Sequence, residues 1–465
     1  MGGGLNAALN SGRTSLQTNQ KAIEITGLNV ANVNTEGYSR QTPILTPYPS
    51  LNYGDFFIGT GVKVGSVGRS HDVFLAGQIS DKSAEVGLEN SMTHPLAELE
   101  RTIGIGDGSL SDEFDQFFDS WRQLSTNPGG EVERQAVLQR GELIGNAFVN
   151  VYNETQQVVK NINNTIVSKI DGVNLQLDEI AQLNNRISAI EMSGQEANSD
   201  RDRRDMLLKN ISEMIGARNF ETSNGTVSVQ LANGMPLVEG NQATHIVSVY
   251  NGTDVNLELD FGTANIPLDR TALGGEFRGL YEVRDVTIPD VVNRLDQLAY
   301  TFATEINAVH QAGTDLNGVA GVDFFVQPAA VLDAASSLSM NITSTSQIAA
   351  GVTPPPGAPG DNRNALAVLD LEQAQLGGLG GNDTLVSFYG KIASTTGVEA
   401  ARNRQAQQGY ADSLVQLQNM RDGIDGVSLE DEMINLMQYQ KGFEASAKFL
   451  ATVDEMMATL LTLKR

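Results

Sequence analysis

The chain has 465 residues, no cysteine, and 31 Lys and Arg against 56 Asp and Glu, which gives a formal net charge of 31 − 56 = −25. This length allows two to four domains, each with a core of its own. The absence of cysteine excludes disulfides and thiolate metal sites. The negative charge disfavours nucleic acid and an anionic membrane surface as partners, because both repel it.

The sequence also bears on compartment and assembly. It contains no run of about 18 apolar residues, so no membrane-spanning helix is predicted. Residues 1–20 lack the basic and apolar regions of a Sec signal. Composition alone predicts a cytoplasmic protein, whereas few aromatic and many Asn, Gln, Ser, Thr and Gly residues favour an extended helical assembly protein. Because like charge keeps subunits apart, assembly would require specific apolar contacts.

The first predicted element is a helix that ends near Asn34, since Gly37 can adopt the left-handed conformation that ends helices. Apolar residues recur in it at every seventh position, at Leu9, Leu16, Ile23 and Val30. Such a repeat places one stripe on a left-handed supercoiled helix. Pro43, Pro47 and Pro49 then predict a linker.

The next segments predict a hairpin and then helices. Valines alternate with glycines within residues 53–69, which predicts a short hairpin. Residues 72–126 are predicted to be helical in pieces, broken near Pro95 and at the sequence IGIGDG. Residues 131–192 contain no proline and keep three-four apolar spacing, which predicts a rod of roughly 90 Å at 1.5 Å per residue.

The middle of the chain changes period. Residues 219–270 alternate with period two and carry three Asn-Gly pairs, which predicts a small all-β insertion. Helical period returns after Pro289. Residues 326–363 are rich in Gly, Pro, Ser and Ala and predict loop or strand, and a further helix is expected over about 384–421.

The last predicted element is a C-terminal helix. Gly423 and Gly426 are expected to break what precedes it, and Ser428 to Asp431 form a Ser-x-x-acid cap. Its seven-residue stripe is Leu429, Leu436, Phe443, Leu450 and Met457. A second line of positions, half apolar and half polar, restricts register and partner number; it is Met433, Gln440, Ala447, Asp454 and Leu461.

Neither terminal helix is predicted to fold alone. The N-terminal stripe offers four apolar side chains worth about 2 kcal/mol each on full burial, against a cost of about 1 to 2 kcal/mol for each ordered residue. We therefore expect both ends to be disordered or loosely helical in the monomer, and to order on meeting each other and neighbouring subunits. An ordinary intramolecular helical hairpin is the alternative.

These elements predict an elongated α+β fold, mainly α, with a nested layout. Residues 1–46 with 424–465 form a terminal helical coiled-coil domain, residues 47–216 with 271–423 form a helical rod, and residues 217–270 form an inserted β domain. The termini are expected to meet at one end of the molecule and the β insertion to lie at the other. This is the geometry of a radial subunit in a tube.

Three groups of motifs resemble the flagellar axial family of rod, hook and hook-associated proteins. The sequence NVANVNTEGYSRQ resembles the family's N-terminal signature. The matching residues are Asn29, Asn32, Asn34, Gly37, Tyr38, Ser39 and Arg40. Residues 426–461 resemble its C-terminal helix. Residues 274–285, 307–325 and 360–371 resemble its larger junction member, rather than hook protein, rod proteins or the shorter second junction protein.

The resemblance implies a function and a set of partners. It implies a ring of these subunits between hook and filament, which contacts hook protein and the second hook-associated junction protein. It further implies export through the flagellar type III apparatus, without a cleaved signal, to an extracellular location, with a chaperone on the C-terminal helix. The extra outer domain of larger members is expected to be missing. The terminal stripes would then carry self-assembly, and the signature residues would shape the turn out of the tube.

Motifs for catalysis or cofactors are not found, so no enzyme, cofactor or metal is expected. The four histidines are scattered, and no phosphate-loop, nucleophile-elbow or dinucleotide motif occurs. Residues 315–323 partly match a calcium loop but lack two of its ligands, which favours an Asx-rich turn. His310, Trp121 and Tyr38 are interpreted as packing residues. The alternative functions are a hook or distal-rod subunit and, more remotely, a secreted cell-wall hydrolase.

Overall fold

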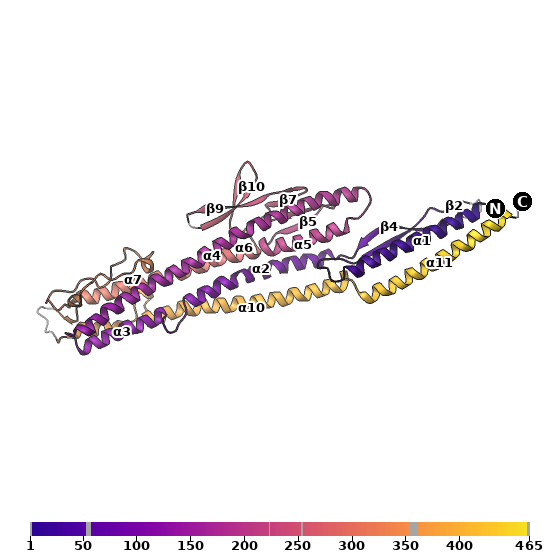
Figure 1. The fold of residues 1–465 in the computed structure, drawn as a ribbon. Coiled ribbons are helices and arrows are strands. Elements are labelled where there is room, and N and C mark those ends of the chain that lie inside the picture. The colour runs from indigo at the N-terminus through magenta and orange to yellow at the C-terminus, as the bar shows by residue number, and fades with distance from the viewer. Residues whose placement is uncertain (1, 53–56, 223, 253, 353–359, 463–465) are drawn as a thin grey trace.

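The computed structural model describes residues 2–52, 57–222, 224–252, 254–352 and 360–462. It shows a long rod of helices continued at one end by a thinner pair of terminal helices (Figure 1). The start of α1 and the end of α11 lie side by side at the tip of that thinner part. The predicted class, α+β and mainly α, is confirmed.

The thinner part, here called the terminal unit, comprises the described residues of 2–69 and 426–462. Helices α1 (Gly2–Ala31) and α11 (Leu429–Thr462) run antiparallel. Strands β1 (Gln41–Pro47) and β4 (Val62–Arg69) pair antiparallel and lie along α1. Strands β2 (Leu51–Asn52) and β3 (Phe57–Ile58) extend this ribbon. The Ser428 Oγ accepts a hydrogen bond from the Asp431 N–H at 3.3 Å, as the predicted cap requires.

Two predictions for the ribbon were wrong. The expected linker is strand β1, in which Pro43 and Pro47 pair with Val67 and Val62. Prolines fit here because each strand of a two-stranded ribbon has a free edge, where a missing N–H costs little. Within 53–69 the expected hairpin is absent from the described residues. This range holds β3 and β4, which pair not with each other but with the earlier strands β2 and β1; residues 53–56 lie outside the described residues.

The rod is built on a single long helix, α4, which covers the whole predicted range 131–192. The other long helices lie beside it (Figure 1). The helices of the rod are α2 (Val73–Thr102), α3 (Leu110–Thr126), α4 (Glu131–Met192), α5 (Asn198–Ile215), the short α6 (Gly275–Glu282), α7 (Ile288–Ala312) and α10 (Leu385–Asp425).

Three helix boundaries differ from the prediction. Helix α2 runs through Pro95, which is buried beside Leu96 and Leu99, so core packing outweighs the cost of an interior proline, about 3 kcal/mol. Helix α10 continues through Gly423 to Asp425, and only Gly426 follows its end. Helical structure begins at Gly275, before Pro289, and passes through a π-helical turn, Val283–Thr287, into α7.

The core of the rod is rich in aromatic side chains from different helices. Phe114 of α3 contacts Phe148 of α4 and Phe302 of α7 edge to face, with ring centroids 5.7 and 5.2 Å apart. Phe117 and Trp121 extend the cluster, and all five side chains are fully buried. Interactions between such rings add about 0.5 to 1.5 kcal/mol per pair beyond area burial.

The β insertion forms two antiparallel sheets. The first contains β5 (Arg218–Glu221), β6 (Val227–Gln230), β7 (Pro236–Glu239) and β8 (Gln242–Ala243). The second contains β9 (His245–Asn251), β10 (Asp254–Asp260) and β11 (Asn265–Leu268). The turn glycines Gly225, Gly234 and Gly252 have φ of 79°, 85° and 67°, as the Asn-Gly signals predict.

The expected position of the β insertion was wrong. The sheets pack along the side of α4 near mid-length of the molecule, not at the end opposite the termini (Figure 1). A long helix leaves an apolar flank uncovered, and buried residues such as Val229 and Leu257 cover it.

The far end of the rod carries short elements between α7 and α10. They are β12 (Gly313–Thr314), α8 (Ala334–Ser337), a 3-10 turn (Thr345–Gln347), β13 (Gly351–Val352), α9 (Arg363–Gln373) and a second 3-10 turn (Gly377–Leu379). Loop or weak strand was predicted for 326–363, of which 353–359 lie outside the described residues; the one-turn helix α8 was not predicted.

Candidate functional site

The two predicted stripes lie on the paired helices α1 and α11. Leu9, Leu16, Ile23 and Val30 are all half-buried, as are Leu436, Phe443, Leu450 and Met457, whereas Leu429 is 48% exposed. The structure therefore brings the stripes onto neighbouring helices of one chain without covering either completely. Their role in self-assembly stays a prediction.

Small and polar residues make the close contact between α1 and α11. The Ser15 and Ser446 Oγ atoms lie 2.9 Å apart. A Cβ added at Gly12 would lie 3.0 Å from the Leu450 Cγ, and one at Gly442 would lie 2.6 Å from the Asn19 Oδ1, so both glycines allow the backbones to approach. Because these contacts involve small and polar residues, the seven-residue apolar repeat does not reveal this surface, which also buries Ala22, Thr26 and Val453.

Asn29 organises the turn that leaves α1. Its Oδ1 accepts hydrogen bonds from the Tyr38 hydroxyl at 2.8 Å and the Gln41 N–H at 3.0 Å. Its Nδ2 donates to the Gln41 carbonyl at 2.8 Å and to Glu432 Oε2 at 3.0 Å. One buried amide thus joins α1, the signature turn, β1 and α11.

Glu432 and Asp425 complete the joint between the terminal unit and the rod, and neither role was predicted from the sequence. The Arg40 Nε lies 2.7 Å from Glu432 Oε1, and the Glu432 side chain is 2% exposed. The Arg40 N–H donates to the Asp425 carbonyl at 2.8 Å. The Asp425 carboxylate accepts from the Ser70 hydroxyl and the Asp72 N–H, both at 3.3 Å. Acidic residues are common in the first turn of a helix, so nothing around Glu432 in the sequence indicates its contact with Arg40, and only the fold reveals it.

The other signature residues shape the turn locally. The Asn32 Nδ2 donates to the Leu28 carbonyl at 2.9 Å. Asn34 is exposed. Helix α1 ends at Ala31, three residues earlier than predicted, so Gly37, with φ of 79°, serves the following turn rather than the helix cap. Burial, with the neighbouring Asp202 and Glu432 carboxylates, raises the pKa of Tyr38 to about 12, which keeps its hydroxyl a neutral donor.

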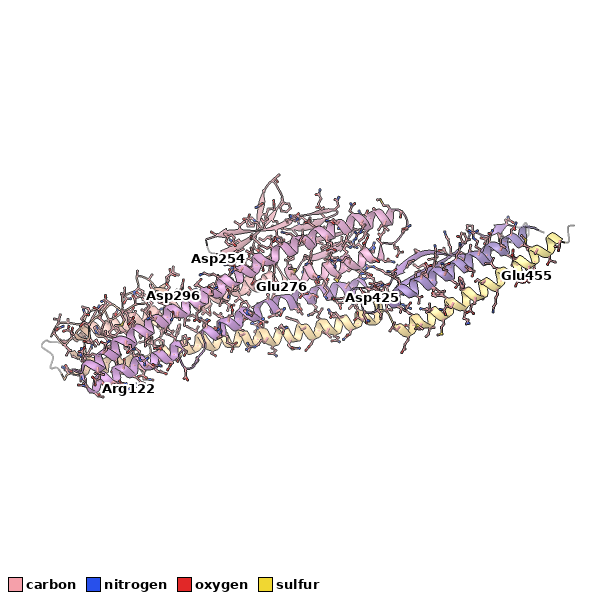
Figure 2. All side chains as sticks on the ribbon, in the orientation of Figure 1. Arg122, Asp254, Glu276, Asp296, Asp425 and Glu455 are labelled. Atoms are coloured by element: carbon pink, nitrogen blue, oxygen red, sulfur yellow. The ribbon has the colours of Figure 1, made fainter. Side chains whose placement is uncertain are left out.

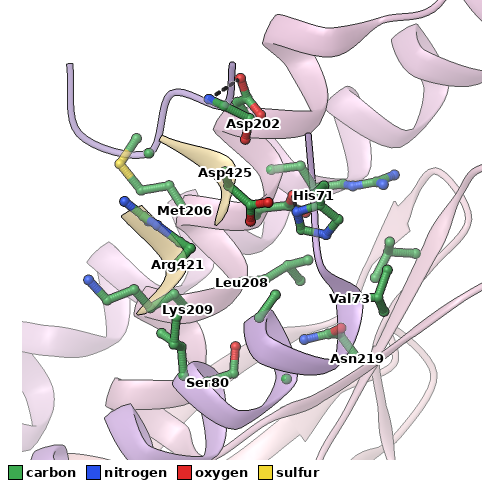
Figure 3. Close-up of a pocket in the computed structure, with 18 of the residues that line it drawn as sticks. His71, Val73, Ser80, Asp202, Met206, Leu208, Lys209, Asn219, Arg421 and Asp425 are labelled. Atoms are coloured by element: carbon green, nitrogen blue, oxygen red, sulfur yellow. Dashed lines mark hydrogen bonds and ion pairs between the residues drawn. The ribbon is translucent and has the colours of Figure 1, made fainter. Parts of the chain in front are cut away.

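A cavity of about 230 Å³, lined by both charged and apolar side chains, lies between the terminal unit, the start of α2 and the middle of α5 (Figure 3). The Arg69 Nη1 donates to Asp202 Oδ1 at 2.9 Å and to Asp205 Oδ2 at 2.7 Å, and the Ser39 N–H donates to Asp202 Oδ2 at 3.1 Å. Asp425 also lines this cavity (Figure 3), and it lies where the thinner part of the molecule meets the rod (Figure 2). Because these charges are paired across the gap, the arrangement holds the terminal unit to the rod.

The residues considered for chemistry have structural partners. His310 is fully buried, its Nε2 lies 3.0 Å from the Ala349 N–H, and burial lowers its pKa, so it packs as expected. Asp315 Oδ1 accepts from the N–H groups of Asn317 and Val319, both at 2.9 Å, which makes the expected Asx turn. Within the described residues, no three His, Asp or Glu side chains are grouped to hold a metal ion, and no helix is apolar enough over a bilayer's width.

Comparisons with known proteins agree with this architecture. Residues 96–325 match the family model of the flagellar hook-associated protein FlgK helical domain. Residues 9–38 match the flagella basal body rod protein model, and residues 425–463 match the C-terminal model of the flagellar basal body rod FlgEFG proteins. Paired terminal helices with rod-protein signatures, joined to a long helical rod, define a subunit of the flagellar axial structures.

Full-length relatives narrow this class. Flagellar hook-associated protein 1 of Escherichia coli (strain K12) is 24% identical over 549 residues, covering 99% of this chain and 100% of the relative. The same protein of Bacillus subtilis (strain 168) is 25% identical, covering 97% and 96%. The solved FlgK hook junction protein of Burkholderia pseudomallei shares the fold, with a TM-score of 0.67 and 14% identity over 75% of this chain and 100% of that chain. The chain belongs to the FlgK family of flagellar hook-associated proteins.

Proposed function

We propose that this chain is a structural subunit of the junction between hook and filament in the bacterial flagellum, and that it assembles through its terminal unit. The observation that carries the proposal is the antiparallel pair of α1 and α11, whose apolar stripes stay half-buried within one chain. Half-buried stripes gain further burial when neighbouring copies cover them. We propose that Leu9, Leu16, Ile23, Val30, Leu429, Leu436, Phe443, Leu450 and Met457 carry these contacts.

The joint supports a division of labour within the subunit. We propose that residues 1–46 with 424–465 form the inner tube, that residues 47–216 with 271–423 form the outer rod, and that residues 217–270 form a separate β domain. Strand β4 pairs with β1 along α1, so we place this strand with the tube rather than with the rod. The signature residues Asn29, Asn32, Asn34, Gly37, Tyr38 and Arg40 then set the direction in which the chain leaves the tube. The Asn29 and Arg40 bonds to Glu432 support this role, because they fix α11 relative to the turn.

The partners follow from the family. The chain is a flagellar protein, and we propose hook protein and the second hook-associated junction protein as its neighbours in the ring. We further propose export through the flagellar type III apparatus, with a chaperone holding the C-terminal helix. A narrow export channel requires an unfolded chain, and the small amount of large apolar surface between α1 and α11 is consistent with ends that unfold readily.

Folding on assembly is part of the proposal. The terminal helices are ordered when neighbouring copies surround them, and loosely helical in a single subunit, because isolated helices are marginal in water. The family consists of structural proteins, and we propose that this member has no enzymatic activity.

A deletion strain tests the function. Cells that lack this chain should keep intact hooks and shed their filaments, as electron microscopy of cells and culture supernatant would show. Loss of the hook itself would point instead to a hook or distal-rod subunit, and normal filaments would refute the junction assignment.

A single substitution tests the surface. Phe443→Asp places a charge on the half-buried stripe, so the strain should shed filaments although the subunit remains soluble with a folded rod. Lys448→Asp changes charge on the exposed side of the same helix and is the matched control. Filaments that stay attached in the Phe443→Asp strain would contradict the proposed contact.

A further inference from the structure

Two exposed apolar patches lie on different sides of the terminal unit. The α11 patch consists of Met433, Ile434 and Met437, which are 49%, 58% and 55% exposed and face away from the side that carries Glu432 and Phe443. The ribbon patch consists of Ile44, Leu45 and Tyr48, which are 50%, 48% and 36% exposed. Helix α1 lies between β4 and α11 (Figure 1), so one subunit cannot bring its own two patches together.

Both patches lie at the same level along α1. Two sets of contacts mark levels on either side of the patches. At the level nearer the rod, Asn29 forms hydrogen bonds with both Gln41, at the start of β1, and Glu432, at the start of α11. At the level nearer the tip of the terminal unit, the Thr18 hydroxyl donates to the carbonyl of Val62, which pairs with Pro47, and Asn19 lies against Gly442. Ile44 and Leu45 of the ribbon patch and all of the α11 patch fall between these levels, and Tyr48 lies one residue beyond Pro47. A neighbour displaced sideways therefore brings unlike patches face to face.

Charge distinguishes the two sides of the terminal unit. In α11, without Glu432, which is paired internally, 2 Lys and 5 Asp or Glu give 2 − 5 = −3. In α1, β1 and β4, without Arg69, which is paired with the rod, 3 Lys or Arg and 1 Glu give 3 − 1 = +2. Lys63 lies beside the ribbon patch, with its Nζ 5.6 Å from the Tyr48 ring centre, and Glu444 lies two turns after the α11 patch, near the level of Gly442. In a chain of net charge −25, this basic side is complementary to α11.

We propose that the ribbon patch of one subunit binds the α11 patch of a second copy of this chain. The two patches differ, so the contact is head to tail, and its repetition builds a ring or helical array rather than a closed pair. This inference rests on the proposed self-assembly and adds the two surfaces that meet. It assigns β1 and β4, which the stripes alone leave without a role, to the interface between subunits.

Cysteine cross-linking tests the pairing, because the natural chain offers no competing thiol. Leu45→Cys and Met437→Cys are produced separately and together in a strain lacking this chain, and hook-junction structures are isolated and oxidised. A covalent dimer linking residues 45 and 437 should appear only when both variants are present. Val415→Cys, on an exposed site of α10, replaces Met437→Cys in the matched control and should give none.

The outcomes separate the inference from the function. Dimers from Met437→Cys alone would overturn it by showing that α11 meets α11. No dimer in the mixed sample, from junctions that hold filaments, would overturn it as well, while filament shedding by the deletion strain would still support the function. Ile44→Cys with Ile434→Cys provides a second pair if either first variant fails to assemble.

Charge reversal provides an independent test in the same strain. Lys63→Glu should cause filament shedding, because it places like charges at the contact, and Lys63→Glu combined with Glu444→Lys should restore attachment. Attachment unaffected by Lys63→Glu, or shedding that the second change does not relieve, would contradict the proposed pairing.

Discussion

The rod and the terminal unit are both helical, but they are stabilised in different ways. The rod buries a continuous apolar core, in which Phe114, Phe117, Trp121 and Phe302 are fully covered. That core includes no residue of the described terminal unit. There, the close contacts are made by Gly12, Ser15 and Ser446 and by the polar joint around Asn29.

This difference indicates which region depends on neighbours. Apolar burial stabilises a single chain at about 25 cal/mol per Å², so the rod can fold alone. Small and polar contacts between two helices contribute much less, and the exposed apolar surface of α11 stays in water until another molecule covers it. The predictions that follow test this contrast.

The largest expected effect is in the rod core. Phe302→Ala removes a fully buried ring between α3, α4 and α7, and should lower the free energy of unfolding by about 3 to 5 kcal/mol. Phe449→Ala makes the same change at a site on α11 that is 47% exposed, and it should change the free energy of unfolding by no more than about 0.5 kcal/mol. Urea unfolding followed by circular dichroism compares the two, and equal losses would remove the contrast.

The rod should also lose stability in acid through His310. Burial lowers the pKa of this histidine, so its neutral form is favoured in the folded state. The resulting stabilisation is present above the ordinary histidine pKa of about 6.5 and is lost as pH falls through the lower folded value. Urea midpoints should therefore fall less steeply on acidification in His310→Gln than in the natural protein. His94→Gln, at an exposed site, is the matched control. If the urea midpoints of the natural protein and both variants fell equally on acidification, His310 would not be a source of the acid sensitivity.

Tyr38 reports on the terminal unit by itself. Its pKa is raised to about 12 by burial and nearby carboxylates, so the folded joint favours the neutral phenol. The stabilisation is present below the ordinary tyrosine pKa of about 10 and is lost as pH rises toward 12. The ultraviolet titration curve of the Tyr38→Phe variant is subtracted from that of the natural protein. The difference should show a phenol pKa near 10 in single subunits and near 12 in assembled junctions. A Tyr38 pKa near 12 in single subunits would show that the joint is already formed before assembly.

The smallest effect on the monomer is expected at the α11 patch. Ile434→Ser changes an exposed side chain, so its free energy of unfolding should stay within about 0.5 kcal/mol of the natural value, although filament attachment weakens. Val132→Ser, at an exposed site on the far end of the rod, should leave attachment intact. Equal attachment in the two strains, measured by counting filaments per cell, would argue against a contact at the α11 patch.

The sequence predicts elements whose signals are local. The range of α4 and the Asn-Gly turns at Gly225, Gly234 and Gly252 were correct, because helical period and turn chemistry are properties of neighbouring residues. Pro95 within α2 was not foreseen, since its tolerance depends on tertiary packing. Strand β1 was missed because its partner β4 lies about twenty residues further on, and its prolines resemble those of a linker.

The candidate site shows the same limit. The signature around Asn29 and Tyr38 was visible as a motif, and the stripes were visible as a repeat. Glu432 was not, because its role exists only when residues some four hundred positions apart are brought together. The β insertion was recognised by its period, but its place beside α4 depends on which flank of the rod is left uncovered.

The central claim is that the terminal helices become ordered only in the assembled junction, and amide hydrogen exchange tests it most directly. In purified single subunits, the amides of residues 5–34 and of α11 should exchange far faster than those of α4, and in isolated hook-junction structures they should become protected. Protection of residues 5–34 equal to that of α4 in a demonstrated monomer would contradict the account.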